Sequence, residues 1–121
     1  MSPRLVRLDH VQLAMPPGVE ATAEAFYVGV LGLRIFVKPP ILAARGGRWF
    51  GNDQLQVHLG SEANFIAARK AHPALAADDL DALANVLDAA GYPVRWSDEI
   101  PEIRRFYADD PFGNRIEFVE A

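Results

Sequence analysis

Three histidines and one glutamate occupy matching positions in the two halves of this chain. Their side chains are of the kinds that bind divalent metal ions. They are His10, His58, His72 and Glu117. His10 and His72 each begin a strand-like segment, whereas His58 and Glu117 each lie between apolar residues in a later one. Three imidazoles and one carboxylate suit Zn²⁺, Ni²⁺, Fe²⁺ or Mn²⁺ and do not favour Ca²⁺.

Two glycines, each at the end of a helix-like stretch, give the register of the repeat. They are Gly32 and Gly91. The first candidate ligand of each half precedes its glycine by 22 residues in the first half and by 19 in the second. The second ligand follows its glycine by 26 residues in both halves. A duplicated unit of about 60 residues, with a ligand near each end, predicts a metal site built from two copies of one module.

The elements that must position these residues follow the same plan twice: strand, helix, and three strands. In the first half the pattern predicts a strand at 5–14, a helix at 20–31, and strands at 33–37, 45–50 and 55–59. In the second half it predicts a strand at 71–77, a helix from Asp78 or Asp79 to Gly91, and strands at 94–96, 103–108 and 114–120. A prolyl-prolyl pair at 39–40 should break the second strand.

Strand periodicity indicates which side chains share a face, because successive side chains point to opposite sides of a sheet. Val57 and Leu59 therefore lie opposite His58, and the apolar residues at 116 and 118 lie opposite Glu117. The apolar face would pack on the helix of each module. The polar face would point into the concave side of the sheet, where four ligands from four strands could meet. A structural alternative has Glu117 solvated and paired with Arg115.

The composition limits the class of protein. The chain has 121 residues, a net charge of −4 with no basic run, and no cysteine. These values predict one domain, at 4–120, made of two repeats at about 4–61 and 69–120, and they argue against nucleic-acid binding, disulfides and thiolate metal sites. No apolar run reaches the roughly 18 residues of a spanning helix. We therefore expect no membrane partner and a cytoplasmic location.

The order of several segments is similar to that of the vicinal oxygen chelate superfamily, which includes glyoxalases, bleomycin-resistance proteins and dioxygenases. The segments are LDHVQLAM, AEAFYVGVLGLRIF and LQVHLG in the first half, and AHPALAADDLDAL and RRFYADDPFGNRIEFVE in the second. The resemblance covers about residues 4–120. It implies an α+β fold in which paired βαβββ modules form a cupped mixed sheet, with the helices on its outer face.

The resemblance also implies a ligand set, because family ligands come from the first and last strands of each module. These positions fall on His10, His58, His72 and Glu117, which would hold one divalent metal, Zn, Ni, Fe or Mn. In many single-domain members two chains pair, and the first module of one completes a site with the second module of the other. A homodimer with shared metal sites and a small-molecule substrate is therefore expected. His58 departs from the pattern, since glyoxalase I usually has Glu or Gln there and other subfamilies use no ligand there.

The chemistry expected at this site is Lewis-acid activation of substrate oxygens by the metal. Glu117 or His58 could leave the metal and act as the base. We expect the substrate-binding residues to lie on the third strand of each module; they are Arg48, Trp49, Arg105 and Tyr107. The arginines could pair with a carboxylate or phosphate, and the aromatic residues could wall the pocket. Because a shift of one residue reverses a strand's facing, surface charges and core packing remain the alternatives.

Three functional classes fit these residues. The leading hypothesis is a metal-dependent lyase or isomerase of the glyoxalase type. The alternative is an extradiol-type dioxygenase, for which His10, His72 and Glu117 would form a two-histidine, one-carboxylate triad for Fe²⁺. The further alternative is a metal-free binding protein of the bleomycin-resistance type, against which the ligand set counts. The additional candidate ligand, His58, favours the lyase or isomerase over the dioxygenase.

Overall fold

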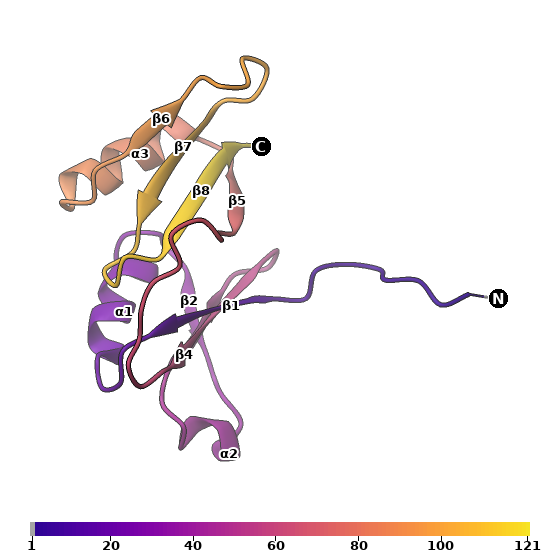
Figure 1. The fold of residues 1–121 in the computed structure, drawn as a ribbon, viewed down its shortest axis with the longest axis vertical. Helices are drawn as coiled ribbons and strands as arrows, with labels where there is room; N and C mark the ends of the chain where they lie inside the picture. The colour runs from indigo at the N-terminus through magenta and orange to yellow at the C-terminus, as the bar shows by residue number, and fades with distance from the viewer. Residues whose placement is uncertain (1) are drawn as a thin grey trace.

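A computed structural model of the chain, which describes residues 2–121, contains the predicted βαβββ unit twice (Figure 1). The first module comprises β1 (Val11–Met15), α1 (Glu20–Tyr27), β2 (Arg34–Phe36), a short helix α2 (Pro40–Ala43), β3 (Arg48–Gly51) and β4 (Gln56–Ser61). The second comprises β5 (Ala74–Ala77), α3 (Leu80–Ala89), β6 (Arg95–Ser97), β7 (Arg105–Asp109) and β8 (Arg115–Glu120). The α+β class and the order of elements are confirmed.

Each module forms its own four-stranded mixed sheet. The strand orders are β1-β4-β3-β2 and β5-β8-β7-β6, so the two sheets have the same topology. The first and last strands pair in parallel in both modules, and the remaining pairs are antiparallel. Strands β1 and β5 each have one partner and lie at a sheet edge. The parallel pairing brings the start of each module beside its last strand, where the candidate ligands lie.

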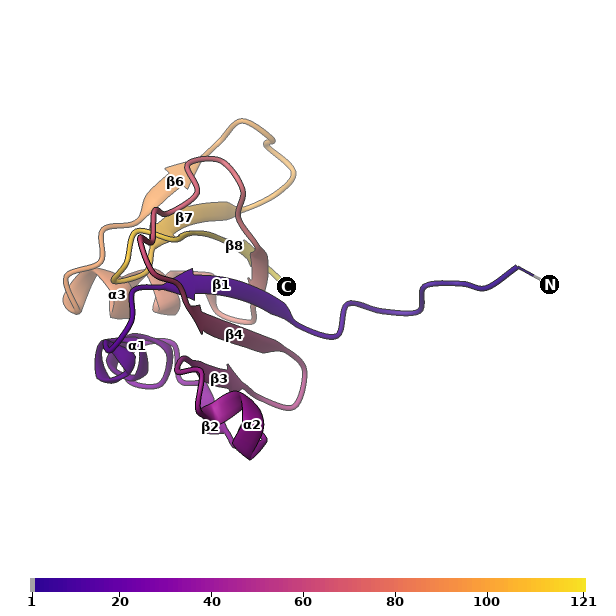
Figure 2. The same cartoon turned by 60° about the horizontal axis from the view of Figure 1, so that its bottom comes forward.

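One helix covers each sheet, and both helices lie on the same side of the molecule (Figure 2). Helix α1 buries Ala23, Phe26 and Tyr27, which lie on one helical face, against its sheet. Helix α3 does the same with Leu80 and Leu87. The predicted cap of α3 is confirmed, since Asp79 Oδ1 accepts a hydrogen bond of 3.0 Å from the backbone N–H three residues later.

The two modules pack against each other through α1 and the end of β1. The ring of Phe26 meets that of Tyr92, from the second module, edge to face with centroids 4.7 Å apart. Tyr27 Oη donates a 2.7 Å hydrogen bond to Asp110 Oδ2 in the β7–β8 turn. Asn114 Nδ2 donates to the carbonyl of Ala14 at 2.8 Å. The modules are thus joined by both apolar and hydrogen-bonded contacts.

The segment before β1 differs from the prediction of a strand starting at residue 5. Regular pairing begins at Val11, and the preceding residues extend away from the body in both views (Figures 1 and 2). The partner strand β4 begins at Gln56, next to the partner of Val11, so within residues 2–121 no strand lies beside the segment. Its apolar side chains are exposed, with relative exposures of 102% for Leu5, 74% for Val6 and 80% for Leu8.

The other differences are shifts of element ends. Helix α1 ends at Tyr27, four residues before the predicted end at residue 31. The Pro39–Pro40 pair ends the second strand as predicted, and it also starts α2, which the sequence did not predict, because proline is well suited to the first helical turn. Gly32 and Gly91 have φ angles of 75° and 89°, the left-handed conformation expected where a helix is terminated. Within residues 2–121, no helix has the length and apolar character needed to cross a bilayer.

Candidate metal centre

The candidate ligands of the first module, His10 and His58, are part of a stack of three rings. His58 lies on β4 and is 4% exposed. Its imidazole is stacked between that of His10, with centroids 4.1 Å apart, and the indole of Trp49, with centroids 4.2 Å apart. Its Nε2 lies 3.0 Å from Gln56 Oε1. His58 is therefore fixed by contacts on both ring faces and at one ring nitrogen.

Burial decides the charge state of His58. It lowers the pKa of the imidazole below its usual 6.5, and the nearby His10 lowers it further. The neutral form is thus favoured at neutral pH, and an uncharged imidazole is the form that binds metals. His10 is more open, and its Nδ1 lies 2.9 Å from Asp9 Oδ2. A carboxylate at Nδ1 leaves Nε2 of His10 as the nitrogen available for a metal.

The ligand pair of the second module is in direct contact. His72 Nε2 lies 3.1 Å from Glu117 Oε1, and His72 Nδ1 lies 2.7 Å from the carbonyl oxygen of Lys70. Since that carbonyl can only accept, Nδ1 carries a proton and Nε2 is the nitrogen that faces the carboxylate. A proton shared by Nε2 and Oε1 would satisfy both atoms, and both are atoms that could serve as ligands to one metal ion. The donor set and its orientation therefore fit a divalent metal.

Glu117 is held as a carboxylate. Its burial would raise the pKa, but hydrogen bonds from His72 and Arg105 outweigh it, so the pKa is lowered from its usual 4.5. Arg105 Nη1 lies 3.4 Å from Glu117 Oε2, and both side chains are 13% exposed. The ionised form is the one that can bind a cation.

Three of the four predicted substrate-binding residues lie on the same polar faces as the ligands. Trp49 stacks on His58, Arg105 contacts Glu117, and Tyr107 meets the ring of His72 edge to face with centroids 5.4 Å apart. Arg48 lies on the opposite, helix-facing side of its sheet. It is in register with the buried Leu59, and its Nε donates a 2.9 Å hydrogen bond to Glu24 Oε1 on α1.

The polar faces of the two sheets match position by position. In the first module Gln12 and Trp49 are the register partners of His58 on either side. In the second module Ala74 and Tyr107 are the corresponding partners of Glu117. His58 and Glu117 thus occupy equivalent places on β4 and β8, with an aromatic residue beside each. This register agrees with the internal repeat predicted from the sequence.

Sequence reasoning missed three residues beside the ligands. Asp9 contacts His10, Gln56 contacts His58, and the guanidinium of Arg115 lies over the ring of Tyr107, 4.2 Å from its centroid. A signal for each was present. Gln56 and Arg115 precede a candidate ligand by two residues on the same strand face, and Asp9 is adjacent to one.

The two ligand pairs remain separate within one chain. Across residues 2–121, no three histidine, aspartate or glutamate side chains are close enough together to hold a metal ion. The pair His10 and His58 lies on the first sheet, and the pair His72 and Glu117 on the second. One chain thus presents two separate pairs of candidate ligands, which are called half-sites below.

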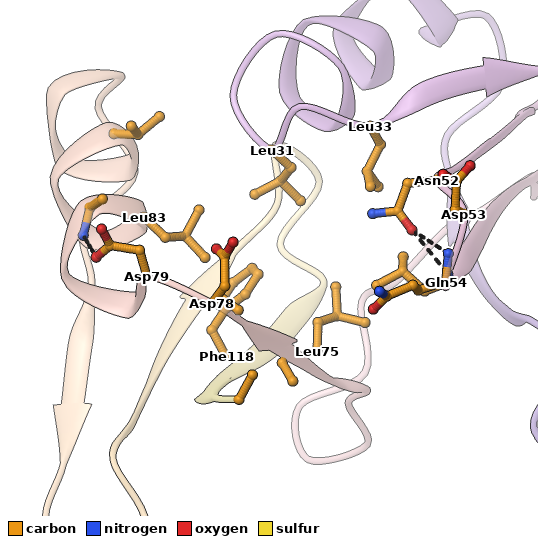
Figure 3. A pocket seen from close by; sticks show the side chains of 16 residues that line it. Leu31, Leu33, Asn52, Asp53, Gln54, Leu75, Asp78, Asp79, Leu83 and Phe118 are labelled. Atoms are coloured by element: carbon orange, nitrogen blue, oxygen red, sulfur yellow. Dashed lines mark hydrogen bonds between the residues drawn. The ribbon is translucent and has the colours of Figure 1, made fainter.

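The clefts of the molecule do not all lie at these half-sites. One cleft, of about 680 Å³, lies between the modules and contains none of the candidate ligands (Figure 3). Its walls include Leu31, Leu83 and Phe118, with Asp78 and Asp79 beside them. A second cleft, of about 360 Å³, is lined by His72, by residues of β1 and by the segment that links the modules. This cleft therefore places the candidate ligand His72 next to space for a small molecule.

Comparison with known proteins identifies the family. Residues 7–118 match the model of the glyoxalase/bleomycin resistance protein/dioxygenase superfamily. The chain therefore belongs to this superfamily, as its sequence motifs predicted. A comparison with curated proteins gave no match.

Solved structures of the family align with nearly the whole chain. A glyoxalase family protein from Bacillus anthracis is 42% identical, with a TM-score of 0.94, over 99% of this chain and 98% of that one. Lactoylglutathione lyase from Agrobacterium tumefaciens is 23% identical, with a TM-score of 0.69, over 100% and 96% of the chains. The antibiotic binding protein TnmS3 from Streptomyces sp. CB03234 is 21% identical, with a TM-score of 0.72, over 96% and 98%. The last two share the fold and leave the function open.

Proposed function

We propose that this protein is a metal-dependent enzyme of the lyase or isomerase type, acting on a small oxygen-bearing substrate. The observation that carries the proposal is the pair of half-sites. Each sheet presents two candidate ligands, and the second pair, His72 and Glu117, is oriented with a nitrogen and an oxygen 3.1 Å apart. Two chains would combine the first half-site of one with the second half-site of the other, which gives two equivalent sites in a homodimer.

The resident cofactor would be Zn, Ni, Fe or Mn, held by His10 and His58 of one protomer and by His72 and Glu117 of the other. Once bound, the ion supplies Lewis-acid polarisation of substrate oxygens. Side chains of the protein would orient the substrate and accept its proton. Arg105 contacts Glu117 and Tyr107 contacts the ring of His72, so both side chains would orient the substrate. His58, neutral and buried, and Glu117, ionised, are the groups that could accept a substrate proton.

The surface of the chain supports assembly with a second copy. Strands β1 and β5 each leave one edge unpaired by any other strand in the described part of the chain. The segment before β1, which ends at the candidate ligand His10, exposes Leu5, Val6 and Leu8. Unpaired edges and exposed apolar residues next to an incomplete site favour a partner that covers them.

The decisive experiment mixes two inactive variants. Neither H10A nor H72A alone should retain the metal, because each removes a ligand from both sites of its homodimer. After unfolding and refolding together, half of the dimers should be mixed, and each of these should contain one intact site. We expect about a quarter of the wild-type metal content, measured by elemental analysis of untagged protein.

Each outcome of this experiment is informative. No recovery in the mixture, with a metal-binding wild type, would show that each site lies within one chain. Unchanged metal content in H72A would refute the ligand assignment itself. Circular dichroism and gel filtration of each variant control for loss of the fold or of the dimer.

A second candidate function, an extradiol-type dioxygenase, is favoured by the contacts of His58. Its Nε2 is engaged by Gln56 and both of its ring faces are covered, whereas Nε2 of His72 faces another candidate ligand, Glu117. A ligand set of His10, His72 and Glu117 without His58 suits Fe²⁺. Oxygen consumption with catechols by the Fe²⁺-loaded protein, and full metal content in H58Q, would favour this function over the first.

A further inference from the structure

Two arginines flank the aromatic ring beside the second half-site. The guanidinium of Arg115 lies 4.2 Å from the ring centroid of Tyr107, and that of Arg105 lies 5.6 Å from it. The Nε atoms of both arginines are buried and have no hydrogen-bond partner among residues 2–121. A guanidinium has five N–H donors, and Arg105 uses one of them, at 3.4 Å, on Glu117. This cluster therefore holds unused donors in a partly buried place.

The polar face of the second sheet carries one arginine more than it has carboxylates to pair with. Arg95 is paired with Asp109 at 3.0 Å, and Arg105 with Glu117 at 3.4 Å. Arg115 forms no ion pair within the described part of the chain, although it is only partly exposed. A half-buried cation without a carboxylate is unfavourable until an anion compensates it.

The space beside Arg115 fits a small ligand. Arg115 and His72 both line the cleft of about 360 Å³, which is within the range of small-molecule sites. The other walls of this cleft are largely apolar and include Leu13, Phe65 and Ala71. A molecule with an apolar part and one charged end would meet both kinds of surface and would lie next to a candidate metal ligand.

We propose that the substrate carries an oxyanion, a carboxylate or a phosphate-type group, which Arg115 binds with the help of Arg105. A guanidinium matches the oxygens of either group with two parallel hydrogen bonds. The ring of Tyr107 fixes the plane of the Arg115 guanidinium by stacking. The inference rests on the proposed function in that it places the anionic end of the substrate beside the metal, and it deepens that function by naming the class of substrate.

The test uses three probes of similar shape on the full-length, untagged protein: phenylacetate, phenylphosphonate and neutral phenylacetamide. Isothermal titration calorimetry at constant ionic strength measures each affinity, with and without added divalent metal. We expect one or both anions to bind at least tenfold more tightly than the amide. The comparison of the two anions distinguishes carboxylate from phosphate-type recognition. Equal affinities for all three probes, or no binding of either anion, would overturn the proposal.

Matched variants assign the binding to the cluster. R115Q should weaken the preferred anion at least tenfold and leave the amide unaffected. R34Q is the control, because Arg34 also lies over an aromatic ring, that of Phe36, with its guanidinium 5.7 Å from the centroid, but far from the second half-site. Unchanged anion affinity in R115Q would refute the assignment. If R115Q does not fold, the comparison of the three probes on the wild-type protein still tests whether the protein prefers anions.

The inference of an anionic substrate and the proposed metal-dependent function can be rejected independently of each other. Metal retention without a preference for anions would leave the metal enzyme standing and reject an anionic substrate. A preference for anions that depends on Arg115, in a protein that retains no metal, would support this inference and reject the metal-dependent reaction.

Discussion

Tyr27 and Asp110, 83 residues apart in the chain, share a buried hydrogen bond of 2.7 Å that joins the two modules. Asp110 also accepts hydrogen bonds from the backbone of Phe112 and from the backbone and side chain of Asn114, at 2.9 Å each. Asn114 in turn donates to the first module at Ala14. The β7–β8 turn is therefore the polar link between the halves, and it determines how the two half-sites are oriented within a chain.

Removing the Tyr27 hydroxyl should destabilise the protein. In Y27F, one of the donors to the buried Asp110 carboxylate is lost while the ring packing remains, which should cost about 1–3 kcal/mol of unfolding free energy. Urea unfolding followed by circular dichroism measures the difference. Y92F is the control, because the partly buried ring of Tyr92 packs on Phe26 and its hydroxyl has no hydrogen bond within residues 2–121. An equal loss in both variants would contradict the role of the link.

The same link should give a pH dependence of known sign. Burial raises the pKa of Asp110 above 3.8, although its hydrogen bonds oppose the shift. Because the folded state holds this proton to higher pH than the unfolded state, the contribution of Asp110 to stability is greatest below 3.8 and is lost as pH rises through its folded pKa. The difference in unfolding free energy between wild type and D110N should therefore shrink as pH rises from 3.8. If the difference in unfolding free energy between wild type and D110N grew with pH, the pKa of Asp110 would not be raised in the folded state.

The stacked rings of His10, His58 and Trp49 in the first module should strengthen metal binding. Trp49 supports His58, which in turn supports His10, so W49L should leave the ligands present but poorly oriented. Loss of such support typically weakens metal binding about 10- to 100-fold. Competition with a chromophoric chelator measures the affinity. The other tryptophan, Trp96, packs on Phe106 and Arg104 away from the ligands, and W96L should bind the metal like the wild type. Equal affinities in the two variants would show that the stack of three rings is only structural.

The exposed N-terminal segment should contribute to self-association. L5S and L8S together remove apolar area that the chain leaves exposed and should weaken the dimer about tenfold or more. Sedimentation equilibrium measures this affinity. I41S, which changes an apolar side chain on α2 that is 75% exposed, is the control. If I41S weakens the dimer and the double variant does not, the interface lies at α2 and not at the N-terminal segment.

The sequence predicted the fold well because the signals were local. Alternating apolar residues marked β4 and β8, the i, i+3 and i+7 spacing of Leu80, Leu83 and Leu87 marked α3, and Asp79 marked its start. The strand predicted at residues 5–14 began too early because pairing depends on where β4 starts, and the pattern of β1 carries no information about that. Helix α2 was missed because Pro39 and Pro40 were treated as breakers and not as a helix start.

The sequence indicated the candidate ligands but few of their contacts. Matching spacing selected the candidate ligands, and alternation placed Glu117 on the polar face, whereas the facing of the strand that holds Trp49 stayed open. The side chain of Arg48 lay on the other face, where Glu24 of α1 engages it, a contact between residues 24 positions apart. The stacking of Arg115 on Tyr107 depends on the register of β7 with β8, which only the folded sheet defines. Separation of the half-sites likewise follows from how the modules pack.

Having ligand pairs on two separate sheets ties occupancy of the proposed site to the amount of protein present. If each ion bridges two chains, metal and chain association stabilise each other by mass action. Dilution of the protein would then release the ion even at constant free metal, and excess metal would hold dilute chains together. Such a protein would be active only above a threshold concentration of the chain, because its activity would depend on how many chains are paired.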